Sequence, residues 1–353
     1  MNVCDVLLKF SFLEDLPRED LANVERAFKV LTLKAGDTLW EQGSPVDGMV
    51  LIVSGLLSVL VDGMEVAHIG EGELAGEASI FVAGSSRSAR MSAHLPTTVL
   101  VLSRVNLFKL KEIGSPVYGR MVEQALQTLA QRVRVTDANF ARLTVGERPI
   151  PTREDSSIFV RLWRALQPGG PDTPCPELTP LLRRHPQLAE VNEDVITALG
   201  WAFTAQPMEE GEILFLEGEE GQAAFVIASG TVEVLRAAQG GRAEVLATLK
   251  EGDYFGINAL IQLSTRTASC VAGSAGWIFS LNVEAYAELS GAPRLAWQEV
   301  MVSTLAAQIR NANWLLRRAM ERSGAKGEQF QKELLRASGY LQGISSERAA
   351  HNS

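Results

Sequence analysis

The chain repeats itself, and this internal duplication limits the folds open to it more than any other feature. A first copy covers residues 31–94 and a second covers residues 203–273. Both copies show the same order of signals: a glycine-marked turn, a Glu and Gly pair, an apolar run that ends in Ser-Gly, two spaced glycines, and Arg-Ser-Ala or Arg-Thr-Ala. A recurring order of this kind marks one structural unit that has been duplicated. We therefore expect two similar domains in tandem.

The pattern within each copy predicts a β-barrel. Short runs of Val, Ile, Leu and Phe alternate with polar residues and stop at Gly or Asp about every 8 to 12 residues, as in many-stranded antiparallel barrels. Helical spacing predicts helices at 18–31 and 116–143 around the first copy, and at 192–201 and 293–320 around the second. The predicted fold is mainly β with flanking helices (α+β): two jelly-roll barrels in tandem, each followed by a long helix.

The duplication also predicts the domain boundaries. The first domain covers 1–143 and the second 181–323, because the long rear helices echo each other at Ala138-Asn139-Phe140 and Ala312-Asn313-Trp314. The segment 144–180 is rich in Pro and is predicted to be a linker with one short helix at 156–166. The polar residues 324–353 form a predicted helical tail, with its helix at 328–341.

Composition excludes several classes of function. The 353 residues carry a net charge of −9, which opposes nucleic-acid binding through a broad basic face. The longest uncharged apolar stretch lies between Asp47 and Asp62 and is too short to span a membrane. Three scattered cysteines indicate reduced thiols and a cytoplasmic protein. No nucleophile, metal-protease, Walker or dinucleotide motif is present in the sequence, so we expect no enzyme.

The segment 72–93, GELAGEASIFVAGSSRSARMSA, resembles the phosphate-binding cassette of cyclic nucleotide-binding domains, in particular that of the bacterial catabolite activator family. The resemblance implies a short helix whose N-terminal backbone N–H groups face the cyclic phosphate. It implies that Gly76 lets the backbone approach the ligand and that Glu77 accepts a hydrogen bond from the ribose 2′-OH. It also implies that Arg87 binds the phosphate, because a guanidinium can donate two parallel N–H bonds.

The same resemblance supplies the remaining candidate ligand-binding residues. Ala78 and Ser88 belong to the cassette, and Val59 and Val66 occupy the positions that pack against the purine. The helix at 116–143 matches the lid of the pocket, which implies that Arg132, Thr136 and Asp137 contact ligand or cassette. Asp137 replaces the small hydroxyl residue of the family, so the preferred base stays open.

The second cassette, at 252–272, is predicted to be degenerate. It retains Gly256, Arg266 and Thr267, but Ile257 stands where the ribose-binding carboxylate is expected. An aliphatic side chain offers no hydrogen-bond acceptor. A ribose hydroxyl buried beside it would lose its bond to water without replacement, which weakens binding by about 1 to 3 kcal/mol. On this interpretation Arg266 serves as an ion-pair partner.

We predict no metal site and no cofactor. His68 lies in a strand-like run, and no second His or Cys follows it at ligand spacing, so it is assigned to the barrel wall. The lack of grouped cysteines and of an axial ligand also opposes the haem and iron–sulfur sensors of the superfamily.

These observations favour a cytoplasmic, non-enzymatic receptor for cAMP or cGMP that binds its ligand in the first domain. Movement of the lid helix would signal to an unidentified protein partner. An apolar seam of Leu126, Leu129, Val133 and Phe140 also suggests a homodimer. The alternative is a ligand-free interaction scaffold built from two degenerate domains, and a third, opposed by the acidic charge, is DNA contact through the tail. The sequence leaves open cAMP, cGMP or a cyclic dinucleotide, and whether the second site binds anything.

Overall fold

The computed structural model describes residues 2–82, 84–144, 148–152, 174–238, 240–262 and 265–324. Its contacts divide the chain into two compact units, one of Met1–Leu129 with Leu305–Ser353, the other of Ala130–Thr304. This division follows contacts, whereas the predicted domain boundaries follow the duplication and stay a prediction. The helices predicted at 156–166 and 328–341 lie outside the described residues.

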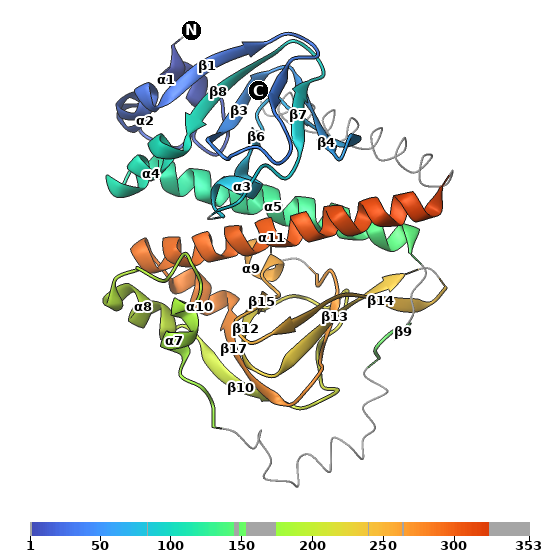
Figure 1. Cartoon of the computed structure of the whole chain (residues 1–353). Coiled ribbons are helices and arrows are strands. Elements are labelled where there is room, and N and C mark those ends of the chain that lie inside the picture. The colour runs from blue at the N-terminus through green and yellow to red at the C-terminus, as the bar shows by residue number, and fades with distance from the viewer. Residues whose placement is uncertain are drawn as a thin grey trace. The chain divides into compact units, whose positions relative to one another are not determined.

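The first barrel consists of two four-stranded antiparallel sheets (Figure 1). One sheet has the order β1 (Phe28–Leu33), β8 (Thr97–Ser103), β3 (Gly48–Ser54), β6 (Leu74–Ala75). The other has the order β2 (Thr38–Trp40), β7 (Arg90–Ala93), β4 (Leu56–Val61), β5 (Met64–Gly70). The predicted barrel of the first copy is confirmed.

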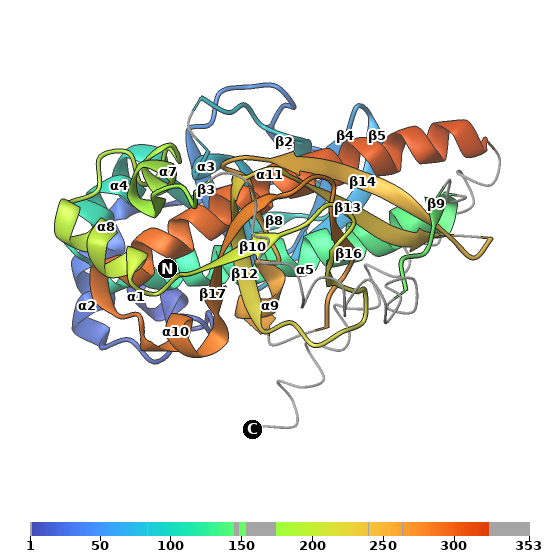
Figure 2. The ribbon, with the colours of Figure 1, turned by 90° about the horizontal axis from the view of Figure 1, so that it is seen from below.

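The second barrel repeats this arrangement strand for strand. One sheet has the order β10 (Thr204–Met208), β17 (Gly276–Asn282), β12 (Ala223–Ser229), β15 (Tyr254–Phe255). The other, part of which is visible in Figure 2, has the order β11 (Ile213–Phe215), β16 (Ser269–Ala272), β13 (Thr231–Ala238), β14 (Arg242–Lys250), β9 (Arg148–Pro149). Strand β9 is a difference from the prediction, because it comes from the segment assigned to the linker and pairs with β14 at Arg242 and Ala243.

Helices flank the strands of both copies. In the first half they are α1 (Val3–Leu7), α2 (Arg18–Val24), a 3-10 turn (Glu25–Ala27), α3 (Glu77–Ile80), α4 (Arg104–Glu112) and α5 (Pro116–Leu143). In the second half they are α7 (Leu178–Arg183), α8 (Glu193–Gly200), α9 (Asn258–Gln262), α10 (Val283–Glu288) and α11 (Gly291–Ser323). None of the described helices has both the length and the hydropathy needed to cross a bilayer.

Three of the four predicted flanking helices are confirmed as α5, α8 and α11. The fourth, predicted at 18–31, is wrong beyond Ala27, because Phe28–Leu33 pairs with β8 as an edge strand. Its two ends, Phe28 and Leu33, are buried while the four residues between are exposed. The helical spacing continues into FKVLTL, but the backbone pairing with β8 overrides it there.

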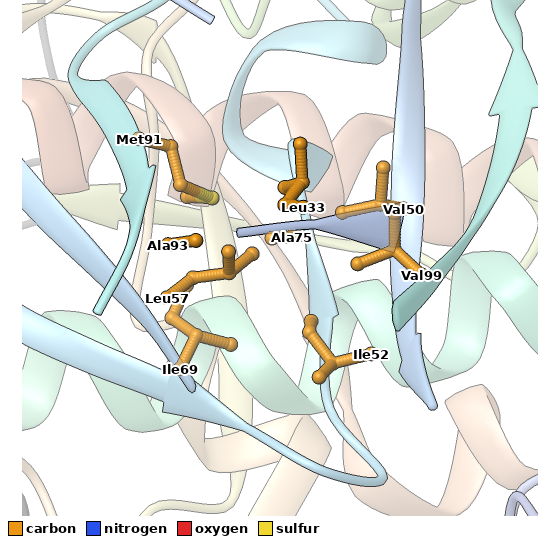
Figure 3. Packing of buried hydrophobic residues seen from close by; sticks show 9 residues of the cluster. All are labelled: Leu33, Val50, Ile52, Leu57, Ile69, Ala75, Met91, Ala93 and Val99. Atoms are coloured by element: carbon orange, nitrogen blue, oxygen red, sulfur yellow. The ribbon is translucent and has the colours of Figure 1, made fainter. Parts of the chain in front are cut away.

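The core of the first barrel explains the shared sequence signals. Nine side chains from seven of its strands form one cluster (Figure 3): Leu33, Val50, Ile52, Leu57, Ile69, Ala75, Met91, Ala93 and Val99. The Ser-Gly that ends β3 is required by geometry, since Gly55 has φ +97° and a Cβ there would lie 2.4 Å from the carbonyl oxygen of Pro96. Gly230 occupies the same place after β12, with φ +84° and 2.7 Å to the carbonyl oxygen of Ala275.

The apolar seam that suggested a homodimer is not an open surface. Leu126, Leu129, Val133 and Phe140 are each at most 6% exposed within the single chain. A second copy could not bury these side chains again, so the seam no longer supports a homodimer, which stays an untested prediction.

We expect Leu57→Ala to lower the free energy of unfolding by about 2 to 5 kcal/mol, because it leaves a cavity at a fully buried core position. The matched control is Leu95→Ala, which removes the same atoms from a half-exposed side chain and should cost about 0.5 kcal/mol or less. Urea unfolding of both variants measures the difference. Equal losses would contradict the described core.

Candidate functional site

The cassette of the first barrel is built around a glycine that touches an arginine. Gly76 has φ +97° and immediately precedes α3, the short cassette helix. A Cβ at this position would lie 3.0 Å from Nη1 of Arg87 and 3.2 Å from the carbonyl oxygen of Gly48. Both the backbone angle and the crowding require Gly, so the backbone at the start of α3 lies directly against the guanidinium.

Arg87 is a buried cation held in place on one side. Its side chain is 2% exposed, and Nη2 donates to Oδ1 of Asp47 at 2.6 Å and to the carbonyl oxygen of Gly48 at 2.7 Å. The guanidinium carbon lies 3.8 Å from the ring centroid of Trp40, a cation–π contact. Burial lowers the pKa of Arg87, while Asp47 and Glu77 act to raise it.

Two nitrogens of Arg87, Nε and Nη1, are buried and have no hydrogen-bond partner among the described residues. A buried N–H group without a partner carries a desolvation cost of about 1 to 3 kcal/mol, and more on a charged group. An acceptor that reached these nitrogens would remove that cost. The arrangement is therefore suited to an anion.

Glu77 is the second charged group of the cassette, and it is fully buried. It is the first residue of α3 and acts electrostatically on Arg87. Ser88, next to the arginine, is partly buried. The structure thus brings together Gly76, Glu77 and Arg87, the three cassette residues to which the resemblance gives roles, and Ser88 follows Arg87 in the chain.

The residues predicted to contact the base lie on the β4–β5 hairpin. Val59 on β4 is partly buried and packs against the core cluster of the barrel, and Val66 on β5 is partly buried. Ala78, in the cassette helix, is contacted from the far end of the chain. Its carbonyl oxygen accepts a hydrogen bond from Nη1 of Arg310 at 3.1 Å, within the first unit.

The predicted lid residues lie on the C-terminal part of α5. Arg132, Thr136 and Asp137 fall in the second unit, which begins at Ala130. A helix advances about 1.5 Å per residue, so Asp137 lies about 12 Å along α5 from Leu129, the last α5 residue of the first unit. Asp137 faces β13 of the second barrel, where its Oδ2 lies 4.0 Å from Nη1 of Arg236. Contact of these three residues with the first pocket stays a prediction.

Four residues that contact the first cassette were not predicted from the sequence: Trp40, Asp47, Gly48 and Arg310. Asp47 and Trp40 lie far from Arg87 in the sequence and reach it through the sheet, so no local spacing reveals them. Only Arg310 could have been predicted, from the repeat between the two long helices. The Ala-Asn-Phe and Ala-Asn-Trp echo aligns Arg310 with Thr136, which was assigned to the lid.

The second cassette keeps the glycine and the arginine but changes their surroundings. Gly256 has φ +71°, and a Cβ there would lie 2.8 Å from Nη1 of Arg266. That nitrogen donates to the carbonyl oxygens of Ala223 and Gly256, at 2.9 and 3.0 Å. Burial lowers the pKa of Arg266 to about 10. The ion pair expected for Arg266 is thus replaced by two main-chain bonds, with Glu219 as a weaker electrostatic neighbour.

Aromatic rings fill the space beside Arg266. Phe225 and Phe255 are paired across β12 and β15, where the first barrel pairs Val50 with Ala75. Their ring centroids lie 4.9 Å apart, and Phe215 stacks within 6.0 Å of both.

The polar partners of the first cassette are also missing from the second. Ile257, 2% exposed, occupies the position of Glu77, and alignment of the two Ser-Gly signals places Gln222 where Asp47 stands. Thr267, partly buried, follows Arg266 as Ser88 follows Arg87. The second cassette therefore keeps the cassette backbone but lacks both carboxylates beside its arginine.

Comparison with known proteins agrees with the geometry. Residues 30–112 and 205–291 match the model of the cyclic nucleotide-binding domain family. A cAMP-dependent protein kinase regulatory subunit of Yarrowia lipolytica is 24% identical over 277 residues, 78% of this chain and 58% of the relative. The cGMP-dependent protein kinase egl-4 of Caenorhabditis briggsae is 22% identical over 289 residues, 81% of this chain and 31% of the relative.

A shorter match supports the resemblance to bacterial activators. The Cyclic AMP receptor protein of Thermus thermophilus is 38% identical over 80 residues, which is 23% of this chain and 37% of the relative. This chain thus spans less than two thirds of each of these three relatives.

The burial of Asp137 predicts a pH-dependent stability. Burial raises the pKa of Asp137 to about 6, partly offset by Arg236, while Glu217 raises it further. Because the folded chain holds this proton to higher pH than the unfolded chain, the contribution of Asp137 to stability falls as the pH rises from about 4 to about 6, by about 3 kcal/mol in all.

We expect Asp137→Asn to remove this dependence. The variant should unfold like the natural chain at about pH 4 and require more urea at about pH 7. Urea midpoints at the two pH values measure the effect. A variant less stable than the natural chain at both would show that the carboxylate is favourably paired.

Proposed function

The chain carries two cyclic nucleotide-binding domains in tandem, and on that premise we propose that it is a non-enzymatic receptor. It binds a cyclic mononucleotide, cAMP or cGMP, in the first barrel, and it signals to a partner protein. It acts in the cytoplasm, a location supported by three free cysteines, two of them buried.

One observation carries this proposal: the buried guanidinium of Arg87, fixed through Nη2, with Nε and Nη1 not hydrogen-bonded to any described residue. The exocyclic oxygens of a cyclic phosphate carry one negative charge and accept hydrogen bonds. Charge-assisted bonds of this kind contribute about 1.5 to 3 kcal/mol each. Arg87 is thus prepared for an anion before the ligand arrives.

The neighbouring groups fit the rest of a nucleotide. Glu77 provides a buried carboxylate that can accept from a ribose hydroxyl, and Gly76 lets the backbone approach the phosphate. Val59 and Val66 offer apolar surface for a base from the β4–β5 hairpin. Nothing in this set selects adenine over guanine, so the proposal covers both.

The second barrel is proposed to be a structural relay. Phe225 and Phe255 stack where a ligand would need room, and Ile257 provides no acceptor for a ribose. The alternative function, an interaction scaffold without ligand, is favoured by these observations for the second half of the chain. The intact set around Arg87 opposes it for the first half.

Helix α11 is the proposed output element. It begins in the second unit, and from Leu305 on it belongs to the first, where Arg310 donates to the carbonyl of Ala78 in the cassette helix. A ligand that tightens the cassette changes the position of this carbonyl and so biases α11. The partner protein is unidentified. Its existence is supported by the similarity to the Yarrowia relative, a cAMP-dependent protein kinase regulatory subunit.

The first test is calorimetric titration of the whole chain with cAMP and with cGMP. We expect saturable binding of at least one nucleotide, and a loss of about a hundredfold or more in affinity in Arg87→Leu, because two charge-assisted bonds are removed. Arg266→Leu is the matched control, since it removes the equivalent buried arginine of the second barrel and should leave the affinity within about threefold.

Thermal unfolding of both variants separates lost binding from lost structure. Absence of heat with both nucleotides in the natural chain would reject the receptor and support the scaffold. A loss of binding confined to Arg266→Leu would move the site to the second barrel.

The second test concerns the output helix. Hydrogen exchange followed by mass spectrometry should show that the bound nucleotide alters amide exchange in residues 305–316 as well as in the cassette. In Arg310→Ala the effect on 305–316 should disappear while protection of the cassette stays. Identical exchange in 305–316 with and without nucleotide would contradict the proposed route.

A further inference from the structure

Three side chains of the first barrel converge at one place outside the nucleotide site: Glu65 and His68 on β5, and His94 directly after β7. Nε2 of His68 lies 2.9 Å from Oε1 of Glu65, and Nδ1 of His94 lies 4.0 Å from the same oxygen. The three ligand atoms all lie within 4.8 Å of one another. Two imidazole nitrogens thus approach a single carboxylate oxygen.

Strand pairing sets this cluster on the face of the sheet that points away from the core. Leu57 pairs with Ile69, and both belong to the core cluster. The next pair along, Ser58 and His68, therefore points to the opposite face, because side chains alternate along a strand. Across the β-bulge that follows, Leu60 pairs with Glu65, which places Glu65 on the same face as His68.

The third residue, His94, is positioned by the neighbouring strand β7. Leu57 also pairs with Ala93 at the end of β7, and the backbone N–H of His94 donates to the carbonyl oxygen of Leu56 at 2.8 Å. The backbone positions of all three residues are thus fixed by the sheet rather than by a free loop. Their side chains are 12%, 28% and 49% exposed, for His68, Glu65 and His94, so an ion from solvent can reach them.

The ligand types and spacing suit a transition metal. Zinc takes His nitrogen and carboxylate oxygen at about 2.0 to 2.2 Å, which puts tetrahedral ligand atoms about 3.4 Å apart. The distances of 2.9 and 4.0 Å to the Glu65 oxygen lie on either side of that value, and no two ligand atoms are more than 4.8 Å apart. Ser58 donates to the carboxylate of Glu65 and also lies 3.3 Å from Nδ1 of His94, so one hydroxyl already holds two of the ligand atoms near each other.

The second barrel provides an internal comparison. There the same pairings place Glu233 opposite Thr248, as Ser58 is opposite His68, and Leu235 opposite Val245, as Leu60 is opposite Glu65. Gly273, whose N–H donates to the carbonyl of Thr231, takes the place of His94. The barrel fold thus forms with Thr, Val and Gly at these positions, so folding alone does not require the two histidines and the glutamate.

We propose that Glu65, His68 and His94 form a binding site for a divalent transition-metal ion such as Zn²⁺. The site has three protein ligands and leaves one position for water or an external ligand. It revises the assignment of His68 to the barrel wall and the prediction of no metal site. His94 lies too far along the sequence to be recognised as a ligand partner, and only strand β7 brings it to His68.

The test is titration of the whole, metal-free chain with Zn²⁺, followed by Co²⁺ as a spectroscopic probe. We expect one ion per chain, visible d–d bands typical of four-coordinate Co²⁺, and a higher unfolding temperature with Zn²⁺. His68→Ala, His94→Ala and Glu65→Gln should each weaken Zn²⁺ binding by at least about tenfold. His94 is half-exposed, so its variant keeps the fold, which the metal-free unfolding temperature verifies.

Two controls remove groups that bind zinc adventitiously. His351→Ala and Cys175→Ser change a histidine and a thiol elsewhere in the chain and should leave the affinity unchanged. The proposal is overturned if Zn²⁺ does not bind at one equivalent, if His68→Ala and His94→Ala bind as the natural chain does, or if a control loses the ion. Nucleotide binding is not part of the readout, so this result and that of the nucleotide titration are independent.

Discussion

The fit between Gly76 and Arg87 is the constraint on which the first cassette depends. A Cβ at residue 76 would lie 3.0 Å from the guanidinium, so only glycine allows the cassette backbone and the buried cation to approach each other. The cation is tolerated because Asp47, the carbonyl of Gly48 and the face of Trp40 surround one side of it. A buried charge needs such partners to offset its desolvation. The remaining N–H groups, Nε and Nη1, are those to which the proposed anion would bind.

The two copies show that the same backbone fold can surround the cassette arginine with different side chains. Both cassettes hold an arginine against a glycine with positive φ, and in both the arginine bonds to the carbonyl that begins a core strand. The copies differ in what fills the neighbouring space: Val50 and Ala75 in one, Phe225 and Phe255 in the other. Because a barrel interior is close-packed, exchanging small side chains for rings removes room for a ligand without changing the strand order.

The β4–β5 hairpin connects the two sites proposed for the first barrel. Its two strands carry Val59 and Val66 for the nucleotide, and the adjacent residues Ser58 and Glu65 belong to the metal cluster. Side-chain alternation puts neighbouring residues on opposite faces of a strand. A change on one face therefore acts on the same short pair of strands as a change on the other, and this gives a physical reason to examine the two ligands together.

The sequence by itself determined the duplication, both barrels, three of the four flanking helices and the cassette residues from Gly76 to Ser88. These features follow from local spacing, from glycines at turns and from strand alternation. Each of these patterns can be recognised within a short stretch of consecutive residues. Only the tertiary structure decided which side chains meet across strands: Asp47 and Trp40 with Arg87, Arg310 with Ala78, and His94 with Glu65. It also placed Asp137 beside Arg236 of the second barrel. Such contacts depend on the register between distant strands and on the length of a helix, and no local pattern records them.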